Sequence, residues 1–178
     1  MRIEVDKIAG MGGGFAHAYA PEEIALDDEY ARLTSPPEIR ARIKRHGERV
    51  ELRGHLSART EVDCDRCLKT INLPVETNFE AVYLPAASIG SNSDDDAVEE
   101  AELQIEDLNV STFDGETIDV DELVREQILL ALPVRALCAE DCQGLCPACG
   151  ADKNIDTSCN CAQTEIDPRW AALKDLQF

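Results

Sequence analysis

Four close pairs of cysteines constrain the fold of this 178-residue chain more than any other feature. Within each pair the two cysteines are separated by one to three residues, a spacing that lets two thiolates of a tight turn reach the same ion. The pairs are Cys64 and Cys67, Cys138 and Cys142, Cys146 and Cys149, and Cys159 and Cys161. A structural zinc ion takes four such ligands, so two pairs complete one site and all four pairs suffice for two.

The last two pairs give the stronger prediction of zinc because they lie close together in the sequence. Residues 146–150 read Cys-Pro-Ala-Cys-Gly, and Gly150 permits the positive φ that a zinc-knuckle turn commonly needs. With Cys159 and Cys161 nearby, a local four-thiolate site requires little loop-closure entropy. A second zinc site, formed by the other two pairs, is predicted by elimination. Spacing alone leaves other pairings of the four couples open.

The remaining signals predict a reducing compartment for these cysteines. The chain has no run of about 18 apolar residues that would span a membrane. Its first residues, Met-Arg-Ile-Glu-Val-Asp, carry acids where a signal peptide needs a basic start and an apolar stretch. We therefore expect a cytoplasmic protein that uses its cysteines as metal ligands. A redox-regulated zinc chaperone, in which oxidant releases zinc and forms disulfides, is the alternative.

No catalytic constellation is visible in the sequence. His17, His46 and His55 each stand alone, without a nucleophile or carboxylate at a catalytic spacing. The glycines at 12–14 lack the pattern of a phosphate-binding loop and indicate a turn, with short strands on either side of it. A catalytic zinc site would need an open coordination position, and no HExxH motif is present. We expect no enzymatic activity and no small-molecule substrate.

Alternating apolar and polar residues predict three β-strands, over 39–44, 50–62 and 71–83. The first cysteine pair lies between the last two strands, so we expect it at the tip of a hairpin. Pro74 within the third strand predicts an edge position or a bulge, because proline cannot donate to a sheet. The spacing of apolar residues after Asp119, with Pro133 as a stop, predicts an amphipathic helix with Asp119 as its N-cap.

These elements predict an α+β fold: a mainly antiparallel β-sheet, one amphipathic helix and a cysteine-rich, zinc-binding C-terminal segment. We divide the chain into a β domain at 1–85, an acidic linker at 86–102, strands and the helix at 103–133, and the cysteine-rich segment at 134–178. Asp167 followed by Pro168 predicts that this last segment ends in a short docking helix with Trp170 and Leu173 on one face.

Charge is distributed unevenly along the chain. The net charge is −19, which argues against a protein that simply coats nucleic acid. Residues 86–126 hold fourteen acids and one base, whereas residues 39–59 hold seven bases and two acids. The exposed side of the predicted strands therefore offers a candidate RNA- or partner-binding face. Its residues are Arg40, Arg42, Lys44, Arg53, His55 and Arg59. An ordinary solvated sheet surface would show the same alternation.

Several motifs together resemble the YceD family of large ribosomal RNA subunit accumulation proteins. They are Cys-Asp-Arg-Cys-Leu at 64–68, the helix end Glu-Gln-Ile-Leu-Leu-Ala-Leu-Pro at 126–133, Cys-Gln-Gly-Leu-Cys-Pro-Ala-Cys-Gly at 142–150, and Ile-Asp-Pro-Arg-Trp-Ala-Ala-Leu at 166–173. The family pattern has Asn-Leu-Asn shortly after the Cys-Pro-x-Cys-Gly turn, where this chain reads Asp152-Lys153-Asn154.

The resemblance implies a non-enzymatic factor needed for accumulation of 23S rRNA and for assembly of the large ribosomal subunit. It transfers no catalytic residue. The family's genes often neighbour that of a small basic ribosomal protein, which suggests a protein client. The partner is thus expected to be 23S rRNA in an assembly intermediate or a small basic ribosomal protein, and the sequence leaves this choice open.

Overall fold

The computed structural model describes residues 1–8, 12–26, 28–89 and 110–156, together with Cys159, Cys161 and Arg169. The chain forms two compact units. The first consists of Met1–Val62 and Asn72–Val134, and the second of Asp63–Ile71 and Arg135–Phe178. Each unit is therefore built from segments that are distant in the sequence. The sequence-based division at residues 85, 102 and 133 stays a prediction.

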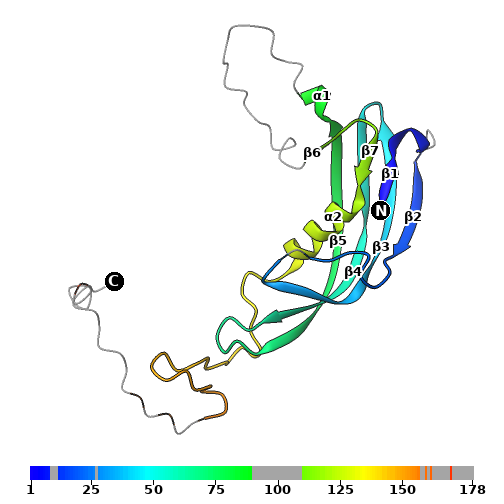
Figure 1. Cartoon of the computed structure of the whole chain (residues 1–178). Helices are drawn as coiled ribbons and strands as arrows, with labels where there is room; N and C mark the ends of the chain where they lie inside the picture. Colours follow the sequence, from blue (N-terminus) through cyan, green and yellow to red (C-terminus); the bar gives the residue numbers. More distant parts are fainter. Residues whose placement is uncertain are drawn as a thin grey trace. The chain divides into compact units, whose positions relative to one another are not determined.

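A five-stranded sheet with the strand order β2-β3-β4-β5-β6 dominates the first unit (Figure 1). Its strands are β2 (Gly13–Ala18), β3 (Ala31–His46), β4 (Arg49–Asp63), β5 (Thr70–Pro85) and β6 (Val110–Phe113). Strand β3 pairs antiparallel with β2 and β4, and β6 pairs parallel with β5. The strands predicted at 39–44, 50–62 and 71–83 are all confirmed within β3, β4 and β5.

Alternation along the strands gives the sheet a buried inner face and an exposed outer face. Ile39 and Leu56 are paired in register and fully buried. One residue further along, Arg40 is paired with His55, and both side chains are exposed. This two-residue period is the one that predicted the strands from the sequence.

The prolines of the sheet lie where the pairing is irregular or incomplete. Strand β3 begins at Ala31, earlier than its alternation indicates, and it continues through Pro36 and Pro37. Two register shifts in the β3–β4 pairing, between Leu33 and Glu38, accommodate this stretch. Strand β5 lies inside the sheet order, but β6 pairs only with Val82–Pro85. Among the described residues, the part of β5 around Pro74 is therefore at the sheet's edge, as expected.

The N-terminal region differs from its sequence-based prediction. Strand β1 (Arg2–Glu4) pairs antiparallel with β7 (Thr117–Asp119), far along the chain, and a 3₁₀ turn at Val5–Lys7 follows β1. The predicted glycine turn at 12–14 is wrong for Gly13 and Gly14, which open strand β2. Gly12 has a φ of 83°, and a Cβ there would collide with the carbonyl oxygen of Ile43. Gly12 therefore lets the chain approach β3 closely.

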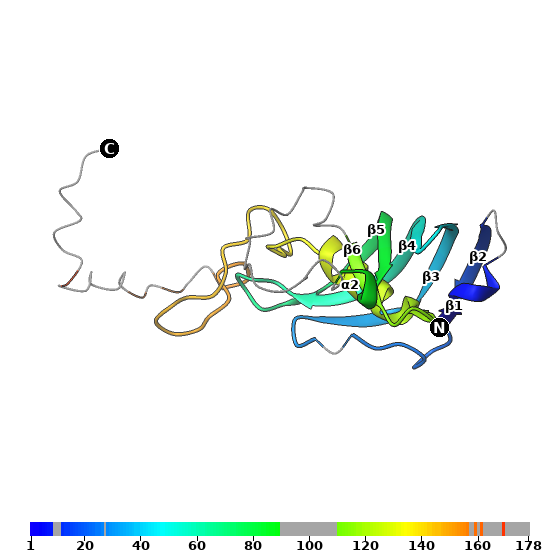
Figure 2. The same ribbon diagram turned by 90° about the horizontal axis from the view of Figure 1, so that it is seen from above.

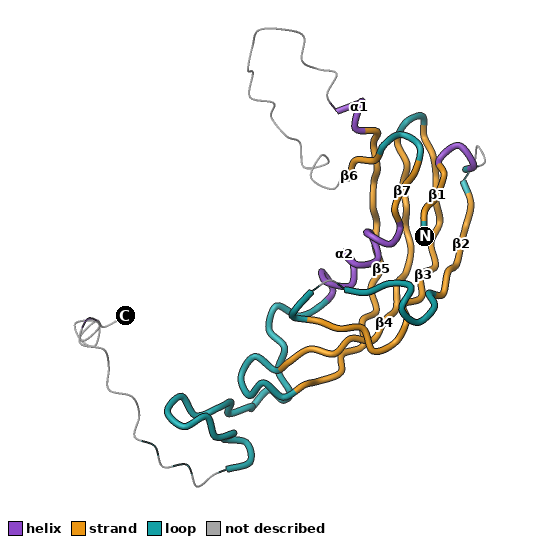
Figure 3. Tube along the Cα trace, in the orientation of Figure 1, coloured by secondary structure: helices purple, strands orange, loops and turns teal. Residues whose placement is uncertain are grey.

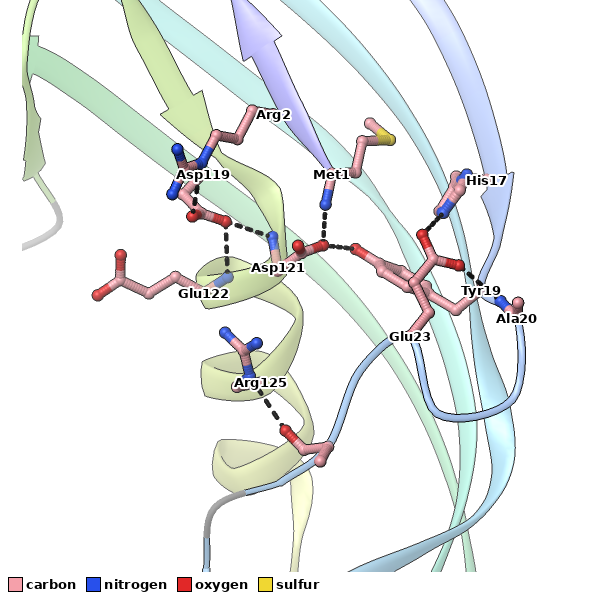
Figure 4. Close-up of polar contacts among 11 residues, drawn as sticks. Met1, Arg2, His17, Tyr19, Ala20, Glu23, Asp119, Asp121, Glu122 and Arg125 are labelled. Carbon is pink, nitrogen blue, oxygen red and sulfur yellow. Dashed lines mark hydrogen bonds and ion pairs between the residues drawn. The ribbon is translucent and has the colours of Figure 1, made fainter.

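Helix α2 (Val120–Ala131) is the predicted amphipathic helix. The carboxylate of Asp119 accepts hydrogen bonds from the backbone N–H groups of Asp121, at 2.9 Å, and Glu122, at 3.3 Å (Figure 4). The helix ends before Pro133 because the residue that precedes a proline is disfavoured in helical geometry. Its buried residues are Val120, Leu123, Val124 and Ile128. With the β1–β7 pair, α2 lies on one side of the five-stranded sheet (Figures 1 and 2).

A polar cluster joins the start of α2 to the end of β2 (Figure 4). The Tyr19 hydroxyl donates to a carboxylate oxygen of Asp121 at 2.7 Å, and the α-amino group of Met1 forms an ion pair with the same carboxylate. Burial raises the pKa of Tyr19 well above its usual range, and the Asp121 carboxylate raises it further. Arg125 donates to the carbonyl of Ala25 at 3.0 Å. These contacts join β2 and the following loop to the helix, and no local sequence pattern predicts them.

Two predicted segments lie largely outside the described residues. The acidic linker at 86–102 opens with a helical turn, α1 (Ala86–Ile89), and its remainder is not described. The predicted C-terminal docking helix likewise lies outside the described residues, apart from Arg169. No described helix is long and apolar enough to span a membrane.

Candidate metal centres

The eight cysteines form two groups of four, and both groups lie in the second unit. The tip cluster contains Cys64, Cys67, Cys138 and Cys142, and the knuckle cluster contains Cys146, Cys149, Cys159 and Cys161. Within each cluster all four sulfur atoms lie within 4.8 Å of one another. Residues 135–156 form neither helix nor long strand (Figure 3). Turns and loops thus carry most of these cysteines, and specific hydrogen bonds fix their positions.

The tip of the β4–β5 hairpin presents the first two sulfurs of the tip cluster. The backbone N–H of Cys64 donates to the carbonyl of Lys69, and that of Leu68 donates to the carbonyl of Cys64, both at 2.9 Å. Leu68 has a φ of 59°, an uncommon left-handed conformation for a residue with a side chain. This tight turn directs the side chains of Cys64 and Cys67 into the interior of the second unit, where both are buried.

Asp65 and Arg66, between these two cysteines, bind the segment that carries the other pair. The Asp65 carboxylate accepts a hydrogen bond from the N–H of Ala136 at 2.7 Å, and the N–H of Asp65 donates to the carbonyl of Ala136 at 2.9 Å. The Arg66 guanidinium donates to the carbonyl of Cys142 at 2.6 Å. The N–H of Leu145 donates in turn to the carbonyl of Arg66. These contacts close a loop of more than 70 residues and give the sequence signature Cys-Asp-Arg-Cys a structural purpose.

The thiols of the tip cluster influence one another electrostatically. Burial raises the pKa of Cys64, but hydrogen bonds from the N–H groups of Cys67 and Arg66 outweigh it and lower the pKa to about 6. The neighbouring sulfurs of Cys142 and Cys67 raise the pKa of Cys138 to about 12. Four sulfurs this close therefore resist carrying four negative charges unless a cation lies between them.

The knuckle cluster is arranged in the same way: backbone N–H groups of a turn lower the pKa of one thiol, and neighbouring sulfurs raise the pKa of another. The N–H of Gly150 donates to the carbonyl of Cys146 at 2.8 Å, and Gly150 has a φ of 74°, as the sequence predicted for this turn. The N–H groups of Cys149 and Ala148 lower the pKa of Cys146 to about 6. The sulfurs of Cys149 and Cys159 raise the pKa of Cys161 to about 12.

The spacing of the sulfurs fits a tetrahedral metal ion. The sulfurs of Cys64 and Cys142 are 3.9 Å apart, those of Cys67 and Cys138 are 3.6 Å apart, and those of Cys149 and Cys159 are 3.5 Å apart. With zinc–sulfur bonds of about 2.3 Å, the edge of a tetrahedron is about 3.8 Å. A disulfide would need about 2.05 Å, and all eight thiols are free. Four-sulfur sets of this size are typical of structural zinc sites.

The structure brings together the pairs that the sequence argument grouped, including the long-range pair reached by elimination. It also reveals residues that the sequence argument missed. Gly144 has a φ of 70°, and a Cβ there would lie 2.9 Å from the carbonyl oxygen of Arg66. Asn154 donates to the sulfur of Cys142 at 3.5 Å. Only the comparison of Asp152-Lys153-Asn154 with the family pattern had drawn attention to this stretch.

The candidate binding face has two kinds of basic residue. Arg53 forms an ion pair with Glu80 at 2.6 Å and a longer one with Glu51, and a ring nitrogen of His55 lies 3.2 Å from the amide oxygen of Asn78. The other four side chains make no ion pair within the described part of the chain. They are Arg40, Arg42, Lys44 and Arg59, all exposed. The structure thus separates free positive charges from neutralised ones.

Comparison with known proteins places the chain among bacterial and plant relatives. An uncharacterised protein of Mycobacterium tuberculosis is 29% identical over 162 residues, which are 89% of this chain and 70% of the relative. The uncharacterised protein YlbN of Bacillus subtilis is 28% identical over 146 residues, 82% of this chain and 76% of the relative. In Zea mays, the chloroplastic large ribosomal RNA subunit accumulation protein YCED homolog 1 is 26% identical over 158 residues, 79% of this chain and 54% of the relative.

No solved structure matches the chain. A family model does match, and its description names an accumulation factor without naming a reaction. The match covers residues 52–177, which include both cysteine clusters and helix α2. This chain therefore belongs to the YceD family, described as large ribosomal RNA subunit accumulation proteins.

Proposed function

We propose that this protein is a non-enzymatic assembly factor that supports 23S rRNA accumulation in the large ribosomal subunit. In this proposal it binds the RNA of an assembly intermediate through the outer face of its sheet. The family description supports the ribosomal role. The free cations of the outer face support the mode of contact.

The observation that carries the proposal is the pair Arg40 and Arg42. Both side chains project from β3 on the outer face, and neither has an ion-pair partner among the described residues. They line a shallow hollow of about 620 Å³, and Gly14 and Ala16 of the neighbouring strand add little bulk to its lining. Unpaired guanidinium groups beside small residues suit bidentate contact with phosphate oxygens.

The composition of the face favours contact with the RNA backbone over contact with bases. The outward positions of β2, β3, β4 and β5 carry no phenylalanine, tyrosine or tryptophan on which a base could stack. Structured RNA is recognised mainly through its phosphates, its 2′-hydroxyl groups and its shape. We infer that the protein recognises a folded region of rRNA without reading its sequence.

We further propose that both cysteine clusters hold zinc. Bound zinc would supply a rigid four-thiolate crosslink and no catalysis, because four cysteines fill its coordination positions. The tip cluster would fix Asp63–Ile71 to the chain after Arg135, and the knuckle cluster would close the loop that follows. Eight free thiols are kept reduced in the cytoplasm, so we propose that the protein acts there.

A small basic ribosomal protein is the competing partner. The net charge of −19 and the fourteen acids of residues 86–126 favour such a client. Most of that segment lies outside the described residues. The outer face offers the better-defined contact, so RNA is the partner proposed. The experiments below would reveal a protein client if that proposal is wrong.

The test of the proposal is rescue of cells depleted of the protein. The wild-type chain should restore the ratio of 23S to 16S rRNA, and the double variant Arg40→Glu/Arg42→Glu should not, at equal protein level. Arg2→Glu/Lys7→Glu is the matched control, because it changes the net charge by the same amount at two exposed, ion-paired residues that do not line the hollow, and it should restore the ratio. Full rescue by Arg40→Glu/Arg42→Glu would refute RNA contact through this face.

A further inference from the structure

Asn154 uses all of its side-chain hydrogen-bonding groups, and one of these hydrogen bonds reaches a sulfur of the tip cluster. Its amide oxygen accepts from the backbone N–H of Gln143 at 2.7 Å. Its amide nitrogen donates to the carboxylate of Asp152 at 2.6 Å and to the sulfur of Cys142 at 3.5 Å. Cys142 belongs to the tip cluster, whereas Asn154 follows the first two cysteines of the knuckle cluster.

The chemistry of these partners fixes the orientation of the amide. The N–H of Gln143 can only donate, so the atom that faces it must be the amide oxygen. The NH₂ group then faces two acceptors, a carboxylate and a sulfur, and each of its two protons has one partner. A flipped amide would lose all three hydrogen bonds. The contact with the Cys142 sulfur therefore follows from the local hydrogen-bond network as a whole.

The backbone around Asn154 forms a closed loop between the clusters. Leu145 and Asp152 form an antiparallel bridge, the N–H of Lys153 donates to the carbonyl of Gly144 at 2.9 Å, and the N–H of Cys146 donates to the carbonyl of Ala151 at 2.8 Å. The knuckle at 146–150 is the tip of this loop, and Cys142 lies next to its base. A metal ion that fixes the tip of the loop also fixes the bridge between Leu145 and Asp152, two residues before Asn154.

From this geometry we infer that Asn154 is a positioning residue that couples the two metal sites, so that metal in the knuckle cluster raises the metal affinity of the tip cluster. The inference rests on the proposed zinc binding. A hydrogen bond to a ligand sulfur stabilises the thiolate and orients it toward the metal. Because binding free energies are reciprocal, metal in the tip cluster raises the affinity of the knuckle cluster by the same factor.

Chelator competition on the full chain tests the inference. Asn154→Ala should weaken zinc binding at the tip cluster about 10- to 100-fold, the usual effect of removing an outer partner of a metal ligand. Asn154→Asp keeps an oxygen for Gln143 but loses the donor to sulfur, so it should weaken binding at least as much. Asn78→Ala is the control. It deletes an asparagine side chain on the outer face of the sheet, outside both clusters, and should leave zinc affinity unchanged.

Coupling is tested by disabling the knuckle cluster with Cys149→Ser/Cys161→Ser. In this background the tip cluster should bind zinc more weakly, and Asn154→Ala should add less than it does in the intact chain. Wild-type affinity in Asn154→Asp would show that only the bond with Gln143 matters. Strictly additive effects would show that the two sites are independent. Either result would overturn the inference.

A spectroscopic measurement on the wild-type chain avoids any dependence on how the variants fold. With a magnetically active cadmium isotope in place of zinc, one side-chain amide proton of Asn154 should show scalar coupling to the metal of the tip cluster through sulfur. Absence of coupling in a chain that holds two cadmium ions would contradict the inference alone. A chain that binds no metal would contradict the zinc proposal itself.

Discussion

Neutralising Arg40 and Arg42 should change the salt dependence of RNA binding by an amount that the structure allows us to calculate. Four basic side chains of the candidate binding face have no ion-pair partner among the described residues. They are Arg40, Arg42, Lys44 and Arg59. Each phosphate contact contributes a slope of about −0.7 to −0.9 to a plot of the logarithm of affinity against the logarithm of salt concentration.

Four contacts predict a slope of about −2.8 to −3.6 for the wild-type chain. A fourfold rise in salt should then weaken binding about 50- to 150-fold. In Arg40→Gln/Arg42→Gln two contacts remain, so the slope should become shallower, at about −1.4 to −1.8. The same rise in salt should then weaken binding only about 7- to 12-fold.

The assay is fluorescence anisotropy of a labelled structured 23S rRNA fragment, titrated at several salt concentrations. Arg2→Gln/Lys7→Gln is the matched control: it removes two exposed, ion-paired charges that do not line the hollow, so it should keep the wild-type slope. An unchanged slope in Arg40→Gln/Arg42→Gln would refute the reasoning, since it would mean that neither arginine displaces counterions. Equal losses in Arg40→Gln/Arg42→Gln and in Arg2→Gln/Lys7→Gln would show that total charge, and not the free pair, controls binding.

Three further predictions concern the metal sites and the stability of the fold. Cys146→Ser should lower the zinc content measured by mass spectrometry from two ions to one, and retention of two would contradict the assignment of the knuckle cluster. Gly144→Ala should weaken protease resistance of the second unit more than Gly150→Ala does, because both glycines have positive φ but only at Gly144 would a Cβ meet a carbonyl oxygen; equal effects would exclude that contact as the cause. The N–H groups of Thr117 and Glu116 and the Thr117 hydroxyl lower the pKa of Asp114, so its ionised form stabilises the fold above the unfolded pKa of about 3.9, and that stability is lost as pH falls through the lower, folded pKa. Asp114→Asn should therefore flatten the acid limb of urea-unfolding stability, and an identical acid limb would refute this.

The sequence predicted those elements whose signal lies within a few neighbouring residues, such as strand β4 and helix α2. The alternation through β4 fixed its buried face, because any slip by one residue would expose Val50, Leu52 and Leu56 together. Asp119 and Pro133 defined both ends of α2, since a side-chain cap and a missing N–H act within one turn. The Cys-Pro-Ala-Cys-Gly sequence likewise indicated its own turn geometry.

Contacts between residues far apart in the sequence could not be predicted from local patterns. Strand β1 has only three residues, and its partner β7 is more than a hundred residues away, so no period in either strand could identify the pair. The same holds for Tyr19 with Asp121 and for Asp65 with Ala136. The grouping of Cys64 with Cys142 was reached only by elimination, because a cysteine couple carries no information about its partner couple.

The role of Asn154 could not have been derived from spacing either. A lone asparagine in a loop is most often a turn residue, and the backbone N–H of Asn154 does take part in a turn that the Asp152 carboxylate closes. Its contact with Cys142 depends on the path of the chain around the knuckle, which only the folded structure shows.

The measurement that tests the central claim most directly is an affinity purification of the tagged protein from growing cells, divided into RNase-treated and untreated halves, with RNA and protein identified in each. The account predicts 23S rRNA and large-subunit proteins in the untreated half, and loss of the ribosomal proteins after RNase. A basic ribosomal protein that survives RNase, or enrichment of no large-subunit component in either half, would contradict it.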